Sequence, residues 1–442
     1  MLSNTATRFV VRNIQRPSLS ITTGNTYQII RSLSQKKNHD HDKPSLYYDV
    51  VPKSDFGQYK EYSVVHTNRS LNIMSDPFQK VMCDLNDLLT TTYNSYKIAI
   101  IPGSGTFGME AVARQFATDE HVLVIRNGWF SYRWTEIFDM GSIPKSHTVL
   151  KARPVLSSSS TVAQKKRQYE PCPVDEVVAK IYKERPAVLF CAHVETSTGM
   201  ILPDDYIRKI SAEIHDVGGL LVLDCIASGA IWADMKELGV DVVISAPQKG
   251  WTGPCCCAMV MMSQRATVRM QTTKETSFSM SLKRWSIIMD KYTSGGYGYH
   301  TTMPTDALRD FHEISVEALK VGLPELKQAQ YNLGRKAREA LNKRGLMSVS
   351  APGFQAPGVL VYYSPGENEN LEMMTKFKKE NLQIAMGVPW KIDEGEGLKT
   401  FRLGLFGLDK MRDIDGTVST LTLALDHILA ETADSIPDSK IA

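Results

Sequence analysis

Short apolar runs alternate with amphipathic segments through the first two-thirds of the chain. The runs are five or six residues long and several are apolar on both faces, which is typical of strands buried in a parallel sheet. Between them, apolar residues recur at spacings of three and four, as in helices that cover a sheet. The predicted strands are 97–101, 121–125, 187–192, 220–224, 241–245 and 257–262. The predicted helices are 76–91, 106–117, 130–140, 173–184, 204–217 and 233–238.

The pattern changes near residue 305. A long helical pattern spans 305–343, and short strands with two further helices, near 370–380 and 410–432, follow it. We therefore expect a large α/β domain over 41–305, with the chain's N-terminal segment, and a smaller α+β domain over 306–442.

Charge separates the first 40 residues from the rest. Residues 1–39 carry six Arg and Lys and no Asp or Glu, whereas the whole chain is only +3. A basic, Ser/Thr-rich, acid-free N-terminus is typical of a mitochondrial transit peptide, so we expect 1–40 to be a transit or disordered segment. The expected location is the mitochondrial matrix. The cytosol is an alternative, and so is the peroxisome, since SKIA at 439–442 partly matches a peroxisomal address.

The rest of the chain argues against several kinds of partner. It is mildly acidic and has no basic stripe for nucleic acid. No apolar run reaches the roughly 18–20 residues of a membrane helix. The seven cysteines, three of them adjacent at 255–257, lack zinc-site spacing, so no metal is expected.

Lys249 is the first candidate for chemistry, because it follows the strand predicted at 241–245. The sequence SAPQKG at 245–250 places a lysine among small residues at a strand's carboxyl end, where α/β sheets present ligand groups. Asp224 ends the preceding strand, and a buried carboxylate there needs a partner. The pyridinium nitrogen of pyridoxal phosphate (PLP) is one candidate partner. The alternative for Asp224 is a helix N-cap.

A glycine-rich loop, GSGTFG at 103–108, follows the first strand and opens a helix. Backbone N–H groups at a helix start bind phosphate. The spacing also matches a dinucleotide loop, which requires an acid at the end of the next strand. That strand ends in Arg126 and Asn127, so a single phosphate fits better. An NAD(P)-dependent oxidoreductase is the alternative from another enzyme class.

Three further segments carry candidate ligand groups. NGWF at 127–130 offers aromatic rings that can stack on a flat ring, and HVETSTG at 193–199 offers hydroxyls. Arg402 stands in the apolar run 400–406, and its planar guanidinium suits a carboxylate. The alternatives are a core aromatic, a capping turn and an internal ion pair, respectively.

In this order, the segments resemble the class V aminotransferases of PLP fold-type I. The nearest branch comprises the alanine–glyoxylate, serine–pyruvate and 2-aminoethylphosphonate–pyruvate transaminases. The resemblance spans roughly residues 60–430 and implies a mostly parallel, seven-stranded-type sheet in a large PLP-binding domain, with a smaller C-terminal α+β domain. The matching segments are GSGT at 103–106, NGWF at 127–130, HVETSTG at 193–199, LDCIAS at 223–228, SAPQKG at 245–250, YHTT at 299–302 and FRLGLFG at 401–407.

The resemblance also implies site roles. Lys249 binds PLP covalently and moves protons, Asp224 pairs with the ring nitrogen, and Arg402 binds the substrate carboxylate. Trp129 is the alternative to Phe130 as the residue that stacks on the ring. The other implied contacts are Gly105, Thr106 and Gln248 at the phosphate, Phe130 and Ile226 on the two ring faces, Thr196 near the ring oxygen, and Tyr299 and Thr302 from the neighbouring subunit of a homodimer.

The predicted activity is PLP-dependent transamination between a small, alanine- or serine-like amino acid and a 2-oxo acid such as glyoxylate or pyruvate. Thr106 stands where the alanine–glyoxylate enzymes resembled here have His and the phosphonate enzymes have Thr. Transamination of 2-aminoethylphosphonate with pyruvate is therefore the alternative. A PLP lyase is a further one. A cysteine desulfurase is disfavoured because Gln248, not His, precedes Lys249, and because the cysteines at 255–257 enter an apolar strand.

Overall fold

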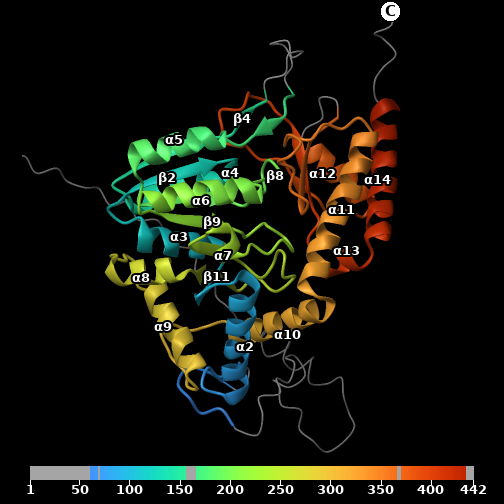
Figure 1. Cartoon of the computed structure of the whole chain (residues 1–442). Helices are drawn as coiled ribbons and strands as arrows, with labels where there is room; N and C mark the ends of the chain where they lie inside the picture. The colour runs from blue at the N-terminus through green and yellow to red at the C-terminus, as the bar shows by residue number, and fades with distance from the viewer. Residues whose placement is uncertain (1–59, 68–69, 156–165, 366–369, 435–442) are drawn as a thin grey trace, which may run out of the picture. The chain divides into compact units, whose positions relative to one another are not determined.

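A seven-stranded sheet forms the centre of the fold in the computed structural model, which describes residues 60–67, 70–155, 166–365 and 370–434. Contacts group Phe56–Ala442 into one compact unit, and the predicted transit segment 1–40 lies outside the described residues. The strand order is β1-β11-β10-β9-β6-β2-β3 (Figure 1). The strands are β1 (Lys97–Pro102), β2 (His121–Arg126), β3 (Ser146–Lys151), β6 (Val188–Ala192), β9 (Leu220–Asp224), β10 (Val242–Ser245) and β11 (Cys257–Met262).

The sheet is mostly parallel, as predicted. Within it, β11 runs antiparallel to both of its neighbours, β1 and β10, while β10, β9, β6, β2 and β3 pair in parallel. The carboxyl ends of all strands except β11 therefore lie along one edge. Each residue of β6, β9, β10 and β11 is buried, which explains why their sequences are apolar on both faces.

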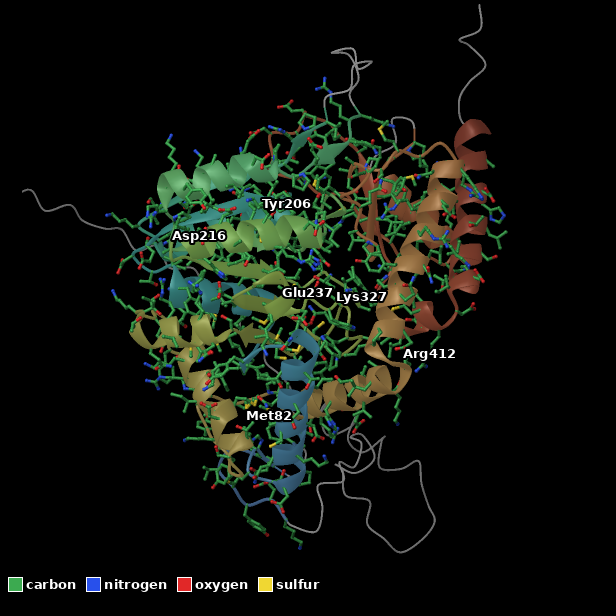
Figure 2. All side chains as sticks on the ribbon, in the orientation of Figure 1. Met82, Tyr206, Asp216, Glu237, Lys327 and Arg412 are labelled. Carbon is green, nitrogen blue, oxygen red and sulfur yellow. The ribbon has the colours of Figure 1, made fainter. Side chains whose placement is uncertain are left out.

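Helices cover this sheet. The contacts show that α3 (Gly105–Phe116) packs on β10 and β11, and that α4 (Trp129–Gly141) packs on β2 and β6. On β9 lies α6 (Asp204–Asp216), with α5 (Val174–Glu184) beside it. The Tyr206 hydroxyl of α6 donates a 2.6 Å hydrogen bond to the Cys172 carbonyl, just before α5 (Figure 2).

Four further helices accompany the sheet: α2 (Asp76–Tyr93) and α7 (Met235–Leu238) were predicted, whereas α8 (Gln264–Thr272) and α9 (Leu282–Thr293) were not. Both α2 and α9 pack on β1, and Met82 of α2 is buried (Figure 2). The short helices α7 and α8 follow β9 and β11 in the chain.

The C-terminal part has its own three-stranded sheet, in the order β12-β14-β13. The continuous helix expected over 305–343 is wrong: Gly322, with φ 103°, separates two helices, and Pro324 supports the start of the second. Leu333, Leu360, Phe401 and Leu425 belong to a second apolar cluster in this part. The elements are α10 (Thr305–Val321), α11 (Leu323–Lys343), β12 (Val359–Tyr363), α12 (Asn370–Lys379), β13 (Ala385–Met386), β14 (Thr400–Gly404), α13 (Leu408–Arg412) and α14 (Ile414–Asp434).

A hairpin of two short strands, β7 (Val194–Glu195) and β8 (Met200–Ile201), joins the two parts of the unit. The Ala356 N–H donates to the Gly199 carbonyl and the Ile201 N–H donates to the Phe354 carbonyl, each at 2.9 Å. The hairpin thus connects the edge of the large sheet to the segment before β12. Among the helices of the described ranges, none is both long and apolar enough to span a membrane.

Candidate functional site

Five of the sequence motifs meet at one edge of the large sheet. The segments that begin at Gly103, Asn127, His193 and Ala246 follow β1, β2, β6 and β10, and Asp224 ends β9. Because these strands are mutually parallel, the fold brings together residues that are up to 146 positions apart in sequence. Carboxyl ends of parallel strands are where open α/β sheets bind ligands.

Lys249 is a half-buried cation at this edge. Its Nζ lies 5.4 Å from the centroid of the Phe406 ring. No described carboxylate lies within ion-pair distance of it. Burial lowers the pKa of its ammonium, and the neighbouring charge of Arg402 lowers this pKa further. The neutral form of the amine, which is the nucleophilic form, is therefore more populated here than in a lysine at the surface.

Asp224 is a buried carboxyl on the strand next to the one that leads to Lys249, paired in register with Ile244. Its side chain is 6% exposed, and its Oδ1 accepts a 2.9 Å hydrogen bond from the Ile226 N–H. Burial raises the pKa of Asp224 to about 7, and the charge of Glu195 adds to the effect. This raised pKa means that no strong cationic partner stabilises the ionised form of Asp224, and a bound cationic group would stabilise it.

The glycine loop approaches the segment after β9 closely. A Cβ at Gly105 would lie 2.5 Å from Cδ1 of Ile226, so a larger residue would displace that side chain. Gly108 has a different reason to be glycine: its Cβ would lie 2.6 Å from the Cβ of Ala258, which makes it a packing position of α3 on β11. The third glycine of the dinucleotide-like spacing therefore has a purely structural explanation.

Polar groups gather around the start of α3. The Thr106 hydroxyl accepts a 3.3 Å hydrogen bond from Nη1 of Arg133. Gln248 is half-buried, and its Oε1 is buried without a hydrogen-bond partner among the described residues. An unpaired buried acceptor of this kind is uncommon, and it marks a position where a ligand donor would be favourable.

The structure separates the two adjacent aromatics Trp129 and Phe130. The guanidinium of Arg133 lies 4.7 Å from the Phe130 ring centroid and that of Arg402 lies 5.9 Å from it. Trp129 instead contacts Tyr132 at 6.0 Å between ring centroids. Phe130 is thus the aromatic that lies with the candidate substrate arginine.

Arg402 reaches the site from β14, in the C-terminal part. Its Nε donates a 2.8 Å hydrogen bond to the Met386 carbonyl of β13, which holds the side chain along the strand pair. Burial lowers the pKa of its guanidinium, and the nearby Glu195 charge opposes this effect. The arginine stays charged, since its ordinary pKa is far above neutrality.

Glu195 is a fully buried carboxylate that organises the edge. Its Oε2 accepts from the backbone N–H and the hydroxyl of Ser131, at 2.8 and 2.7 Å. Its Oε1 accepts from the Phe130 N–H, the Ser197 N–H and the Ser197 hydroxyl, at 3.1, 3.0 and 2.8 Å. Five donors from two loops converge on one side chain, which fixes the start of α4 against the hairpin that carries Thr196, a half-buried residue.

We expect Glu195→Gln to lower the free energy of unfolding by about 3 kcal/mol. The NH2 group of the new side chain would face N–H and O–H donors, and the hydrogen bonds to a charged carboxylate would be lost. Urea denaturation measures the change. Glu110→Gln is the control: Glu110 pairs with Arg114 at 2.8 Å near the surface of α3, and its loss should cost about 0.5 kcal/mol or less. Equal losses in the two variants would contradict the organising role.

Tyr299 and Thr302 are placed differently from the other predicted residues. They lie between α9 and α10 and are exposed, Tyr299 to 55%. No hydrogen bond within the described ranges joins either side chain to Lys249, Asp224 or the glycine loop. Their assignment to a neighbouring subunit's site stays a prediction.

Arg133 and Phe406 are site residues without a role in the sequence prediction. Arg133 lies one helical turn after Phe130 in NGWFSYR, and its charge acts on both Asp224 and Lys249. That spacing is the signal that points to it, since residues three apart on a helix share a face. Within the described ranges, no cluster of three or more His, Cys, Asp or Glu side chains could hold a metal ion.

Comparison with known proteins finds similarity to the aminotransferases. The model of the class V aminotransferases matches residues 161–352. The 2-aminoethylphosphonate–pyruvate transaminase of Bacillus thuringiensis (strain Al Hakam) is 25% identical over 350 residues, covering 78% of this chain and 87% of the relative. The soluble hydrogenase small subunit of Synechococcus sp. (strain PCC 6716) is 27% identical over 345 residues, covering 76% and 80%.

Solved structures with the same fold include two glyoxylate aminotransferases. The alanine–glyoxylate aminotransferase of Nostoc sp. superposes with a TM-score of 0.69 at 20% identity, covering 81% of this chain and 89% of the other. The ureidoglycine–glyoxylate aminotransferase of Bacillus subtilis gives a TM-score of 0.66 at 20% identity, covering 83% and 88%. The predicted α/β architecture with a mostly parallel seven-stranded sheet is thereby confirmed.

Proposed function

We propose that this chain is a class V aminotransferase, which transfers an amino group between a small amino acid and a 2-oxo acid with PLP as cofactor. The observation that carries the proposal is the convergence of three groups at one sheet edge. Asp224 ends β9, Lys249 follows the adjacent parallel strand β10, and Arg402 reaches the same place from β14.

The residues present fit PLP on their own chemistry. Asp224, a buried carboxyl, would pair with the ring nitrogen, and the unpaired Gln248 Oε1 and the start of α3 lie where polar ligand groups are favourable. Lys249 is a half-buried amine with a lowered pKa. Phe130 and Ile226 would enclose the two ring faces, with Gly105 leaving room for Ile226. Thr106 and Thr196 offer hydroxyl groups as further hydrogen-bond partners for the cofactor.

PLP, when bound, supplies an electron sink for the carbon that carries the amino group. The chain supplies the rest. Lys249 Nζ would bind the cofactor, and it would then take a proton from the substrate α-carbon and deliver it to the cofactor. Asp224 would hold the ring nitrogen protonated, and Arg402 would fix the substrate carboxylate so that the α-carbon faces Lys249.

An alanine- or serine-like donor with glyoxylate or pyruvate as acceptor is the substrate pair we propose. A single carboxylate anchor, Arg402, serves both the amino acid and the oxo acid. The second candidate is 2-aminoethylphosphonate with pyruvate, which Thr106 and the Bacillus relatives favour.

Addition of single donors to the PLP-loaded protein tests the proposal. Alanine, serine, aspartate and 2-aminoethylphosphonate should be supplied in turn without an acceptor, while the visible absorption band of lysine-bound PLP is recorded. The true donor should bleach the band, and its 2-oxo acid or aldehyde product should appear in equal amount. Glyoxylate or pyruvate should then restore the band. Ammonia released without acceptor would point instead to a PLP lyase, and the absence of any band would contradict the cofactor assignment.

We further propose a homodimer and a mitochondrial location. The exposed Tyr299 and Thr302 support the first, because polar groups there are free to reach a second subunit. The basic, acid-free residues 1–39 support the second. Light scattering of the purified protein and imaging of the chain with and without these residues test them; a monomer, or an unchanged location, would contradict each.

A further inference from the structure

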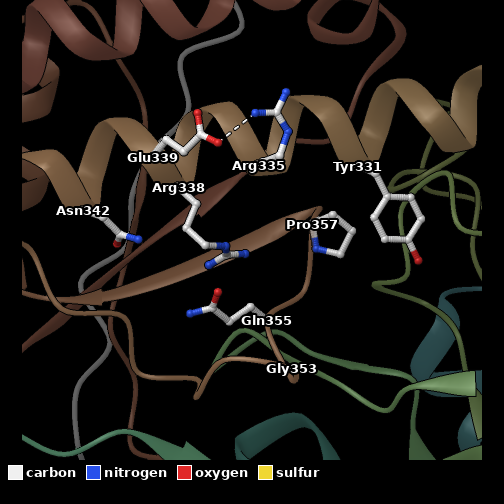
Figure 3. Close-up of a pocket in the computed structure, with 9 residues that line it drawn as sticks. Tyr331, Arg335, Arg338, Glu339, Asn342, Gly353, Gln355 and Pro357 are labelled. Atoms are coloured by element: carbon white, nitrogen blue, oxygen red, sulfur yellow. Dashed lines mark hydrogen bonds and ion pairs between the residues drawn. The ribbon is translucent and has the colours of Figure 1, made fainter. Parts of the chain in front are cut away.

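A second pocket lies in the C-terminal part, away from the residues assigned to amino transfer. It has a volume of about 330 Å³ and is enclosed by α11 and the segment before β12 (Figure 3). This volume is in the lower range of small-molecule sites. Its charged lining residues are Arg335, Arg338 and Glu339, which give a net charge of +1.

Arg338 is the unusual residue of this pocket. Its side chain leaves α11 and points toward Gln355 on the opposite wall (Figure 3). Nη2 donates a 2.7 Å hydrogen bond to the Ala356 carbonyl, whereas Nη1 is buried and has no hydrogen-bond partner among the described residues. Burial lowers the pKa of its guanidinium. A guanidinium in such a position is stabilised only by an anion or by further acceptors.

Among the described residues, no carboxylate forms an ion pair with Arg338. The one side chain among them that interacts with its guanidinium, through its charge and a side-chain hydrogen bond, is the phenol of Tyr362. The hydroxyl hydrogen of Tyr362 goes to Asn342 Oδ1 at 2.9 Å, so its oxygen is free to accept from Arg338. Burial raises the pKa of that phenol, so it is neutral at physiological pH. Glu339, the acid in the pocket wall, is paired with Arg335 at 2.7 Å (Figure 3).

We propose that this pocket binds a small oxyanion, a phosphate or carboxylate group, on the guanidinium of Arg338. The planar donors of arginine match the two oxygens of such a group. Asn342, whose Oδ1 already accepts from Tyr362, offers its amide nitrogen from the same helix. Gln355, whose Nε2 donates to the Ser350 carbonyl at 3.1 Å, has a second amide hydrogen on the opposite wall. This site is independent of the amino-transfer proposal.

Two hydrogen bonds connect the pocket to the amino-transfer edge. Ala356 accepts from Arg338 through its carbonyl and donates its N–H to the Gly199 carbonyl. Gly199 belongs to the hairpin that carries Glu195 and Thr196. An anion bound to Arg338 would therefore also restrain Ala356, and through it the hairpin at Gly199.

Binding of inorganic phosphate and of succinate to the PLP-loaded full chain tests the proposal by calorimetry, with sodium chloride at matched ionic strength as reference. At least one oxyanion should bind. Arg338→Gln should weaken binding tenfold or more, as expected for a lost charged hydrogen-bond pair. Gln355→Glu should do the same, because it places a carboxylate opposite the guanidinium. Lys336→Gln, on the same helix but paired with Asp415 outside the pocket, should leave binding unchanged.

Each other outcome has a definite meaning. If Arg338→Gln does not fold, the folded Gln355→Glu protein decides the question. Arg402→Gln should retain binding, which separates this pocket from the substrate position. Failure of wild type to bind either oxyanion beyond the chloride reference, or equal binding by wild type and both pocket variants, would overturn the proposal.

Discussion

Replacement of Lys249 by alanine is expected to reduce amino transfer by about 10⁴-fold or more, because it would remove both the proposed cofactor attachment and the proposed proton-transfer group. The lowered pKa of the amine, caused by burial and by Arg402, is the property that suits it to both tasks. The single-donor half-reaction, followed by absorbance in the PLP-loaded protein, measures the effect. In the Lys249→Ala protein, after borohydride treatment and reloading with PLP, the visible band of lysine-bound PLP should be absent.

Two controls separate chemistry from folding. Lys249→Arg keeps the charge but not the nucleophilic amine, so it should be nearly as inactive. Lys391→Ala removes another cation near the edge, 5.6 Å from the Trp129 ring centroid, and should retain most of the activity. Thermal unfolding should be similar in all three variants. If Lys249→Ala stayed within tenfold of wild type, the assignment of the cofactor lysine would be wrong.

Asp224→Asn is expected to lower amino transfer by about 10²- to 10³-fold, the usual cost of losing one electrostatic partner of a reacting group. The amide can accept a hydrogen bond from the ring nitrogen but cannot hold it protonated. The maximal half-reaction rate should fall much more than substrate affinity, because Arg402 and Lys249 remain. Stopped-flow absorbance at varied donor concentration separates the two quantities.

The same variant has a pH signature. The buried Asp224 carboxyl has a pKa raised to about 7, against an ordinary value of 3.8, so between these values the folded chain holds a proton that the unfolded chain has released. Stability of the PLP-free wild type should therefore fall as pH rises from about 4 to about 7, and Asp224→Asn should lack this component.

The matched control is Asp241→Asn. Asp241 is a buried carboxylate just before β10, paired with His215 at 2.7 Å, and its loss should reduce stability without altering cofactor chemistry. A half-reaction as slow in Asp241→Asn as in Asp224→Asn would show that any buried carboxylate matters equally. The pyridinium assignment would then be lost.

The sequence predicted those parts of the fold whose side chains are buried on both faces. All six strands expected from apolar runs exist, because a strand enclosed by helices has no polar face to obscure it. The seventh strand, β3, was missed. Its sequence, SHTVLK, is only partly buried, since it lies at the sheet edge and pairs with β2 alone. Likewise, the helical spacing of apolar residues continues through Gly322, but the φ of 103° at Gly322 ends one helix and Pro324 stands in the first turn of the next.

The site was predictable as a set of motifs but not as an arrangement. The sequence places Trp129 and Phe130 side by side at the start of a helix, where successive side chains point about 100° apart. Only the fold decides that Phe130 faces Arg402. The five-donor network of Glu195 was likewise hidden, because three of its donors come from Phe130 and Ser131, 64 or 65 residues away, whose position depends on strand order.

The pairing of β1 with β11 sets when the site can form. These strands are antiparallel partners, with Lys97 opposite Met262, and Gly105 follows the first of them. During synthesis β1 waits for more than 150 residues before its partner leaves the ribosome, and contacts of such separation form slowly. Nascent chains that end before β11 should therefore have Asp224 but no ordered glycine loop. Binding of the proposed cofactor would therefore come late in folding, only in chains whose seven-stranded sheet is complete.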